Sequence, residues 1–134
     1  MNQTFCEEEI LWVEEGRGIA TRGRIGEQEE FFQDHFPDFP VLPGVLMLEI
    51  LKRAAEYYLS KITGRQNRYA LKQIKNVKFT SYLKPGDSWQ AAVQIASEDE
   101  SGFHCKGQLL QDQRPAASAQ FILRPVLTAP HSNI

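Results

Sequence analysis

The chain has 134 residues, of which 42% are hydrophobic and 24% charged, with a formal net charge of −2 at pH 7. This composition is typical of one ordinary globular domain, and it excludes disordered, collagen-like and disulfide-rich classes. The first residues resemble no secretory signal and the longest apolar stretch is too short to span a bilayer, so we expect a cytoplasmic protein without a membrane span.

Two strands are predicted near the N-terminus, at residues 10–15 and 19–25, around a turn that contains Gly16 and Gly18. No helix follows this Gly-x-Gly pair, so a hairpin turn is favoured over a phosphate-binding loop. From about Pro43 to Lys61 the apolar residues recur at three- and four-residue steps, which predicts a helix that Gly64 terminates. Its first half is apolar nearly all round, as in a helix buried on most sides.

Three more strands are predicted where apolar residues alternate, at 89–95, 103–109 and 117–123. The connections at 97–102 and 111–115 are short and polar, as hairpins require. Strands, one helix and then strands again predict an α+β domain. We expect a single domain over residues 1–124 and a frayed tail at 125–134, which has two prolines and few apolar residues.

The stretch from residue 35 to residue 49 carries the clearest chemical pattern. It reads His-Phe-Pro-Asp-Phe-Pro-Val-Leu-Pro-Gly-Val-Leu-Met-Leu-Glu, with three prolines between His35 and Glu49. The prolines hold His35 on a stiff, extended arm, and Pro43 suits the first helical position. Gly44 allows close approach to the N–H groups at the helix start, and Glu49 falls among apolar residues where a carboxylate is costly to bury. Together these groups predict an active site.

This pattern resembles the signature of the 3-hydroxyacyl-[acyl carrier protein] dehydratases of bacterial fatty acid synthesis. A second block, Ile74–Phe79 followed by Leu83–Asp87, resembles the strand and turn after the helix in that family. The resemblance runs from about Glu9 to Arg124 and implies the hot-dog fold, an antiparallel sheet wrapped around one long helix. It implies a lyase that converts the 3-hydroxyacyl group to the trans-2-enoyl thioester in fatty acid or related acyl-chain biosynthesis. No metal and no cofactor beyond the carrier's pantetheine arm is implied.

Dehydration of a 3-hydroxyacyl thioester needs a base, an acid and a donor for the thioester oxygen. His35 has the intrinsic properties of the base, and Glu49 suits the acid because desolvation favours a protonated carboxyl. The amide of Gly44, with that of Val45, is expected to bind the oxygen. The resemblance implies that His35 and Glu49 meet across the interface of a homodimer, which can assemble further into a trimer of dimers.

Two residues depart from the family pattern. Arg53 stands where members commonly carry Gln, and an i,i+4 pair with Glu49 would favour the ionised carboxylate. We therefore treat Arg53 as a candidate modulator, either facing Glu49 or pointing away from it. Asp38 replaces a glycine and adds charge beside the base, and the segment before the first strand is shorter than in similar enzymes. These departures are consistent with a specialised dehydratase of a secondary pathway.

Charge is unevenly distributed along the chain. Residues 1–49 carry eleven acidic and three basic side chains, whereas residues 57–86 carry seven basic and no acidic ones. One interpretation is lysines solvated on a surface; the other is a docking surface for an acidic partner. The resemblance implies acyl carrier protein as that partner, with Lys72, Lys75 and Lys84 as candidate docking residues. No nucleic-acid recognition motif accompanies the charges.

Two alternative functions are open: a hot-dog acyl thioesterase, in which a carboxylate activates water, and a non-catalytic acyl-binding module. Many such thioesterases have no His-Phe-Pro arm, which argues against the first. The other histidines, His104 and His131, are interpreted as structural. Cys6 and Cys105 have neither metal-ligand nor redox spacing and are expected to be free thiols.

Overall fold

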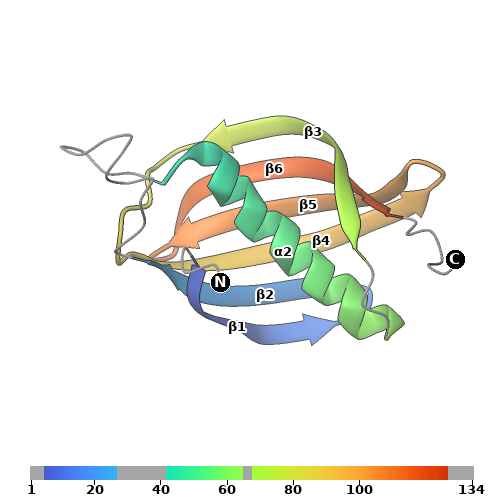
Figure 1. Ribbon diagram of the computed structural model, residues 1–134, viewed down its shortest axis with the longest axis horizontal. Helices are drawn as coiled ribbons and strands as arrows, with labels where there is room; N and C mark the ends of the chain where they lie inside the picture. The colour runs from blue at the N-terminus through green and yellow to red at the C-terminus, as the bar shows by residue number, and fades with distance from the viewer. Residues whose placement is uncertain (1–4, 27–41, 65–67, 127–134) are drawn as a thin grey trace, which may run out of the picture.

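The computed structural model describes residues 5–26, 42–64 and 68–126. Within these ranges a single antiparallel sheet of order β1-β2-β4-β5-β6-β3 curves around one long helix (Figure 1). The elements are β1 (Phe5–Glu14), β2 (Gly18–Ile25), α2 (Gly44–Thr63), β3 (Tyr69–Phe79), β4 (Ser88–Asp99), β5 (Gly102–Gln111) and β6 (Arg114–Pro125). This architecture is the α+β class that the local patterns predict, in the hot-dog arrangement that the family resemblance implies.

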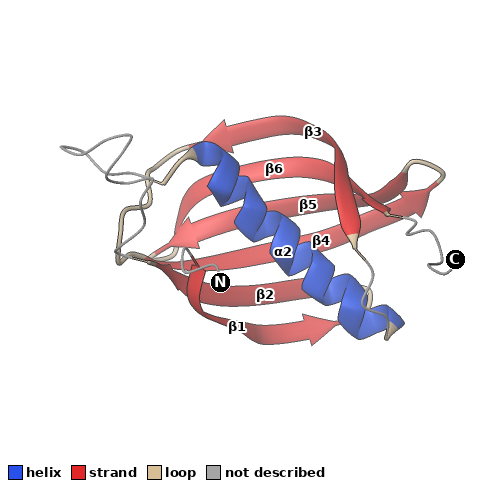
Figure 2. Ribbon diagram, viewed as in Figure 1, coloured by secondary structure: helices blue, strands red, loops and turns tan. Residues whose placement is uncertain are grey.

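The helix α2 crosses one face of the sheet (Figure 2). The side chains that it packs against the sheet are buried and recur at helical spacing: Met47, Ile50, Leu51, Ala54, Ala55, Tyr58 and Leu59. Its other side is more open than the sequence predicts, since Val45 is 71% exposed and Leu46 and Leu48 are only partly buried. The prediction of a first half buried on most sides is nevertheless confirmed in part, because Val45 is the only exposed residue between positions 44 and 53.

The two ends of α2 differ in how well the sequence predicts them. Pro43 is the N-cap and not the first helical residue, because its ψ of 145° is extended; the helix begins at Gly44. At the other end Gly64 has φ 73°, and its N–H donates to the carbonyl of Ser60 at 2.9 Å. This left-handed glycine terminates the helix as predicted.

The hairpins between the last three strands are tighter than predicted. Residues 100–101 and 112–113 alone form the two turns. Asp112 and Gln113 both have positive φ, of 50° and 64°, which is the backbone that a two-residue turn of type I′ needs. Neither is glycine, so this turn carries backbone strain that the pairing of the two strands must offset.

One close approach between β2 and β4 organises the core. Gly23 pairs with Trp89, a side chain that is only 1% exposed. A Cβ added at Gly23 would lie 2.5 Å from the indole ring, so only glycine leaves room for Trp89.

The free thiol of Cys105 also lies in the core. Burial raises the pKa of this thiol to about 12, which makes it unreactive.

No helix in the described ranges is both long and apolar enough to cross a bilayer.

Candidate active site

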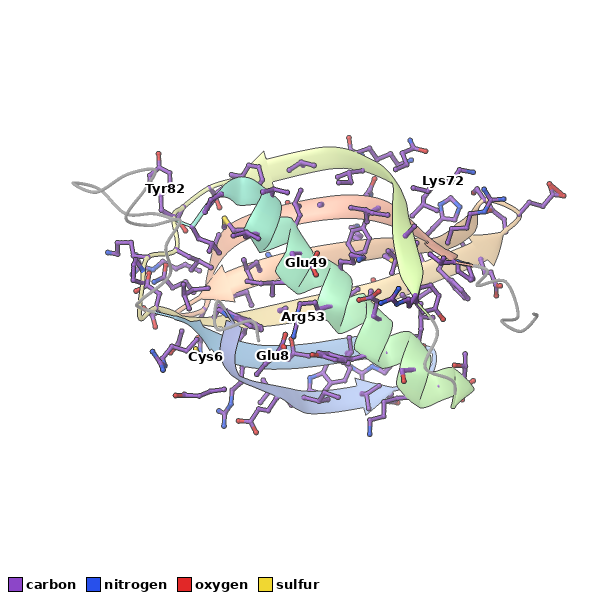
Figure 3. All side chains as sticks on the ribbon, in the orientation of Figure 1. Cys6, Glu8, Glu49, Arg53, Lys72 and Tyr82 are labelled. Carbon is purple, nitrogen blue, oxygen red and sulfur yellow. The ribbon has the colours of Figure 1, made fainter. Side chains whose placement is uncertain are left out.

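Glu49 lies on the side of α2 that faces away from the sheet (Figure 3). Its neighbours Ile50 and Leu51 point into the core and are fully buried, whereas Glu49 is half-buried. The sequence predicts a buried carboxyl at this position. In the single chain the carboxyl is instead half-buried, on the face of the helix that points away from the sheet.

The start of α2 presents amide donors on the same element. The amides of Leu46 and Met47 donate to the carbonyl of Pro43 at 2.9 and 3.3 Å, so those of Gly44 and Val45 precede the helical hydrogen-bond ladder. Glu49 stands five residues after Gly44, about 7.5 Å along the helix axis. The amides and the residue that carries the carboxyl therefore lie within two turns of each other on one helix.

The ring of Phe79 closes over the backbone of Gly44. A Cβ added at Gly44 would lie 2.8 Å from the Phe79 ring, so the absence of a side chain lets an aromatic surface approach the amide. Phe79 is itself half-exposed, and Val45, next to Gly44, and Tyr82, three residues after Phe79, are more exposed still. The amide donors thus stand beside an apolar, partly open surface.

Arg53, one turn after Glu49, forms an ion pair with Glu8, a residue that is not among the site residues predicted from the sequence. Its Nε donates to Glu8 Oε2 at 3.2 Å and its Nη2 donates to Glu8 Oε1 at 2.5 Å, a two-point ion pair. The hydroxyl of Tyr57 donates to Glu8 Oε1 at 2.9 Å and accepts from Arg53 Nη2 at 3.2 Å. Figure 3 shows Arg53 extending from α2 towards Glu8 on β1. We call Glu8, Arg53 and Tyr57 the Glu8 cluster.

The Glu8 cluster changes the charge properties of its members. The hydrogen bond to Glu8 raises the pKa of Arg53, so the guanidinium stays charged. Burial raises the pKa of Tyr57, and its hydrogen bond to Glu8 adds to the effect. Glu8 could have been found from the alternation of β1, where it is the half-buried position between the exposed Glu7 and Glu9.

Several predicted site residues cannot be placed. His35 and Asp38 lie outside the described residues, and so does His131. The pairing of His35 with Glu49 therefore stays a prediction.

The three candidate docking lysines are exposed, but they do not gather at one place. Lys72 and Lys75 lie on β3, whereas Lys84 lies in the turn before β4. Figure 3 shows Lys72 and Tyr82 at opposite ends of the molecule, and Lys84 follows Tyr82 by two residues. The carbonyl of Leu83 accepts from the amide of Leu42 at 2.7 Å, which places Lys84 beside the start of α2.

Two other features of the described residues lie outside this site. A hollow of about 560 Å³ lies on the face of the sheet opposite α2, where Gln94, Lys106 and Gln108 line it, far from Glu49. At the β4–β5 hairpin, Asp99 and Ser101 both contact the same nitrogen of His104, at 2.9 and 3.2 Å. A catalytic triad needs its serine and its carboxylate on different ring nitrogens, so this cluster has the geometry of a turn-stabilising network.

The model of the ApeI-like dehydratase family matches residues 12–119 of the chain. The chain belongs to this family. Among curated proteins, this ApeI-like chain is 35% identical over 89 residues to the 3-hydroxyacyl-[acyl-carrier-protein] dehydratase FabZ of Bacillus cereus, a match that covers 66% of the chain and 62% of that protein. It is 33% identical over 106 residues to FabZ of Lactobacillus helveticus, covering 78% of the chain and 72% of that enzyme. The chain thus spans less than two thirds of the first of these relatives.

Solved structures confirm the hot-dog fold. The dehydratase heterocomplex ApeI:P from Xenorhabdus doucetiae superposes with a TM-score of 0.65 at 20% identity, over 92% of this chain and 98% of the other. A hypothetical thioesterase of Streptococcus pneumoniae with coenzyme A gives a TM-score of 0.68 at 8% identity, over 90% and 89% of the two chains. At such identities these similarities establish the fold alone.

Proposed function

We propose that this ApeI-like protein dehydrates 3-hydroxyacyl groups on acyl carrier protein to the trans-2-enoyl thioester. The observation that carries the proposal is the position of Glu49, half-buried on the side of α2 away from the sheet and within two turns of the amides of Gly44 and Val45. Relatives named as 3-hydroxyacyl-[acyl-carrier-protein] dehydratases support the same chemistry.

In the proposed reaction, His35 removes a proton from C2 of the acyl chain. Negative charge then develops on the thioester oxygen, where the amides of Gly44 and Val45 stabilise it as hydrogen-bond donors. Glu49 donates its proton to the 3-hydroxyl group, which leaves from C3 as water, and the C2–C3 double bond forms. The protonated His35 and the ionised Glu49 return to their starting states by proton exchange with solvent.

We propose that the site is completed by a second copy of the chain, which supplies His35 opposite Glu49. The strand β3 is an edge of the sheet, and the apolar side chains along it and around the start of α2 are exposed: Val45, Ile74, Val77, Phe79 and Tyr82. An open edge strand with exposed apolar residues suits pairing with another chain. Because ApeI:P is a heterocomplex, a non-identical second chain is the alternative partner.

We further propose that the acyl carrier protein approaches at the start of α2. Lys84 is exposed there, beside the turn that precedes β4, and an acidic carrier would be attracted to its charge. Lys72, at the other end of the molecule, is then too far away to take part in the same contact.

The test is to incubate the purified chain with a 3-hydroxyacyl-loaded carrier protein and follow the acyl group by mass spectrometry. Loss of one water from the loaded carrier, together with formation of the conjugated enoyl thioester, is the expected result. Release of a free acid and an unloaded carrier would instead indicate a thioesterase. Binding of the loaded carrier without any change in its mass would indicate an acyl-binding module.

A further inference from the structure

We propose that Glu8 is a positioning residue, which holds the Arg53 guanidinium against β1 and so keeps this cation from pairing with Glu49. The inference rests on the proposed function, in which Glu49 is the acid that must hold a proton. It assigns a role to β1, a strand that the proposed reaction does not otherwise use.

The first step of the argument is that Arg53 has two competing positions. Glu49 and Arg53 are four residues apart on one face of α2, the spacing at which oppositely charged side chains on a helix pair (Figure 3). In the structure Arg53 instead makes its two-point ion pair with Glu8, across a separation of 45 residues in the chain.

The second step is that Glu8 is the stronger of the two partners. Its side chain is only 10% exposed, and a carboxylate so shielded is costly to leave without a cation. Two parallel N–H donors match its two oxygens, and the Tyr57 hydroxyl adds a third donor. Glu49 is half-buried as well, but Arg53 and Tyr57 converge on the carboxylate of Glu8 and not on that of Glu49.

The third step concerns the other charges near Glu49 in the described part of the chain. On α2 these are Lys52, Arg53 and Glu56, and Glu8 on β1 joins this group through its contact with Arg53. Lys52 forms an ion pair with Glu56 at 3.8 Å, one turn further along α2. Each cation that flanks Glu49 is therefore engaged by a different acid, an arrangement that suits a carboxyl required in its protonated form.

The experiment is a titration of the Glu49 carboxyl by carbon-13 NMR, with the signal assigned from Glu49→Gln. In Glu8→Gln, Arg53 is released to Glu49, and the titration midpoint of Glu49 should fall by about one pH unit or more. In the double variant Glu8→Gln/Arg53→Gln the midpoint should return close to the wild-type value, since the released cation is gone. Glu9→Gln, which removes a charge from the exposed side of the same strand, is the matched control and should leave the midpoint in place.

A Glu49 midpoint that stays in place in Glu8→Gln would overturn the inference, and so would a midpoint that stays low in the double variant. Should Glu8→Gln fail to fold, Glu8→Asp tests the same point. Its shorter side chain weakens the two-point ion pair with Arg53, so the titration midpoint of Glu49 should fall by a smaller amount. An unmoved midpoint in Glu8→Asp would then count against the inference. The titration needs no turnover, so absence of enoyl product from the wild-type protein would refute the proposed function and leave this test intact.

Discussion

Glu49 and Glu56 occupy the same helix two turns apart, and they allow a single-residue comparison. Both carboxyls are half-buried, and burial raises the pKa of Glu56. Glu49 is the one nearer to the amides at the start of α2, whereas Glu56 is engaged by Lys52. Position along the helix, more than burial, therefore distinguishes the proposed acid from its neighbour.

We expect Glu49→Gln to lower turnover of a 3-hydroxyacyl carrier substrate by at least about a hundredfold, the scale of a lost general acid. Folding should survive, because Glu49 fills no space in the core. The matched control Glu56→Gln should retain turnover within a few-fold of wild type. Steady-state rates and thermal melting of the three proteins check this. Equal losses of turnover in both variants would show that Glu49 is not the general acid.

The Asp99 network makes a pH-dependent prediction away from the site. Hydrogen bonds from Ser101, and next from His104, lower the pKa of Asp99 to about 2. A carboxyl with a depressed pKa in the folded state stabilises the fold above its unfolded pKa, and this stabilisation is lost as the pH falls towards 2. NMR titration should show a low midpoint for Asp99, and Ser101→Ala should raise it. An ordinary midpoint in the wild-type protein would show that the turn network does not form in solution.

At the scale of elements, the contact between Gly23 and Trp89 tests how β2 and β4 pack. Gly23→Ala puts a methyl group 2.5 Å from a buried indole that has no room to move, so we expect a loss of about 1–3 kcal/mol in unfolding free energy. Gly107→Ala is the comparison, because its methyl group meets the flexible Leu51 side chain at 3.2 Å. Denaturant unfolding should show the larger loss for Gly23→Ala, and the reverse order would contradict this packing.

Local patterns predict most of the elements but not the contacts between them. Alternation and helical spacing locate the strands and α2, because each pattern reflects which side of one element is buried. These patterns do not distinguish the N-cap from the first helical position for Pro43, because the fixed φ of proline suits both and only ψ differs between them. Alternation along β1 can mark Glu8 as an inward-facing position, but no local period reports its contact with Arg53, which is 45 residues away.

At the scale of the whole molecule, the positions of the lysines predict where the carrier docks. Lys84→Glu should weaken use of a carrier-bound substrate much more than use of a small thioester analogue, and added salt should reduce the difference. Lys72→Glu is the matched control at the far end of the molecule and should affect the two substrates alike. The ratio of kcat/KM for the two substrates checks this. A larger change in that ratio for Lys72→Glu than for Lys84→Glu would indicate that the carrier docks on β3 instead.

The central claim is a site shared between two copies of the chain, with His35 from one and Glu49 from the other. The most direct measurement mixes two inactive variants, His35→Ala and Glu49→Gln, and allows their subunits to exchange. In a twofold dimer half of the random pairs are mixed and each mixed pair holds one intact site, so recovery of about a quarter of wild-type activity is expected. Co-purification through different affinity tags would establish the exchange. Proven exchange with no recovery of activity would contradict the shared site.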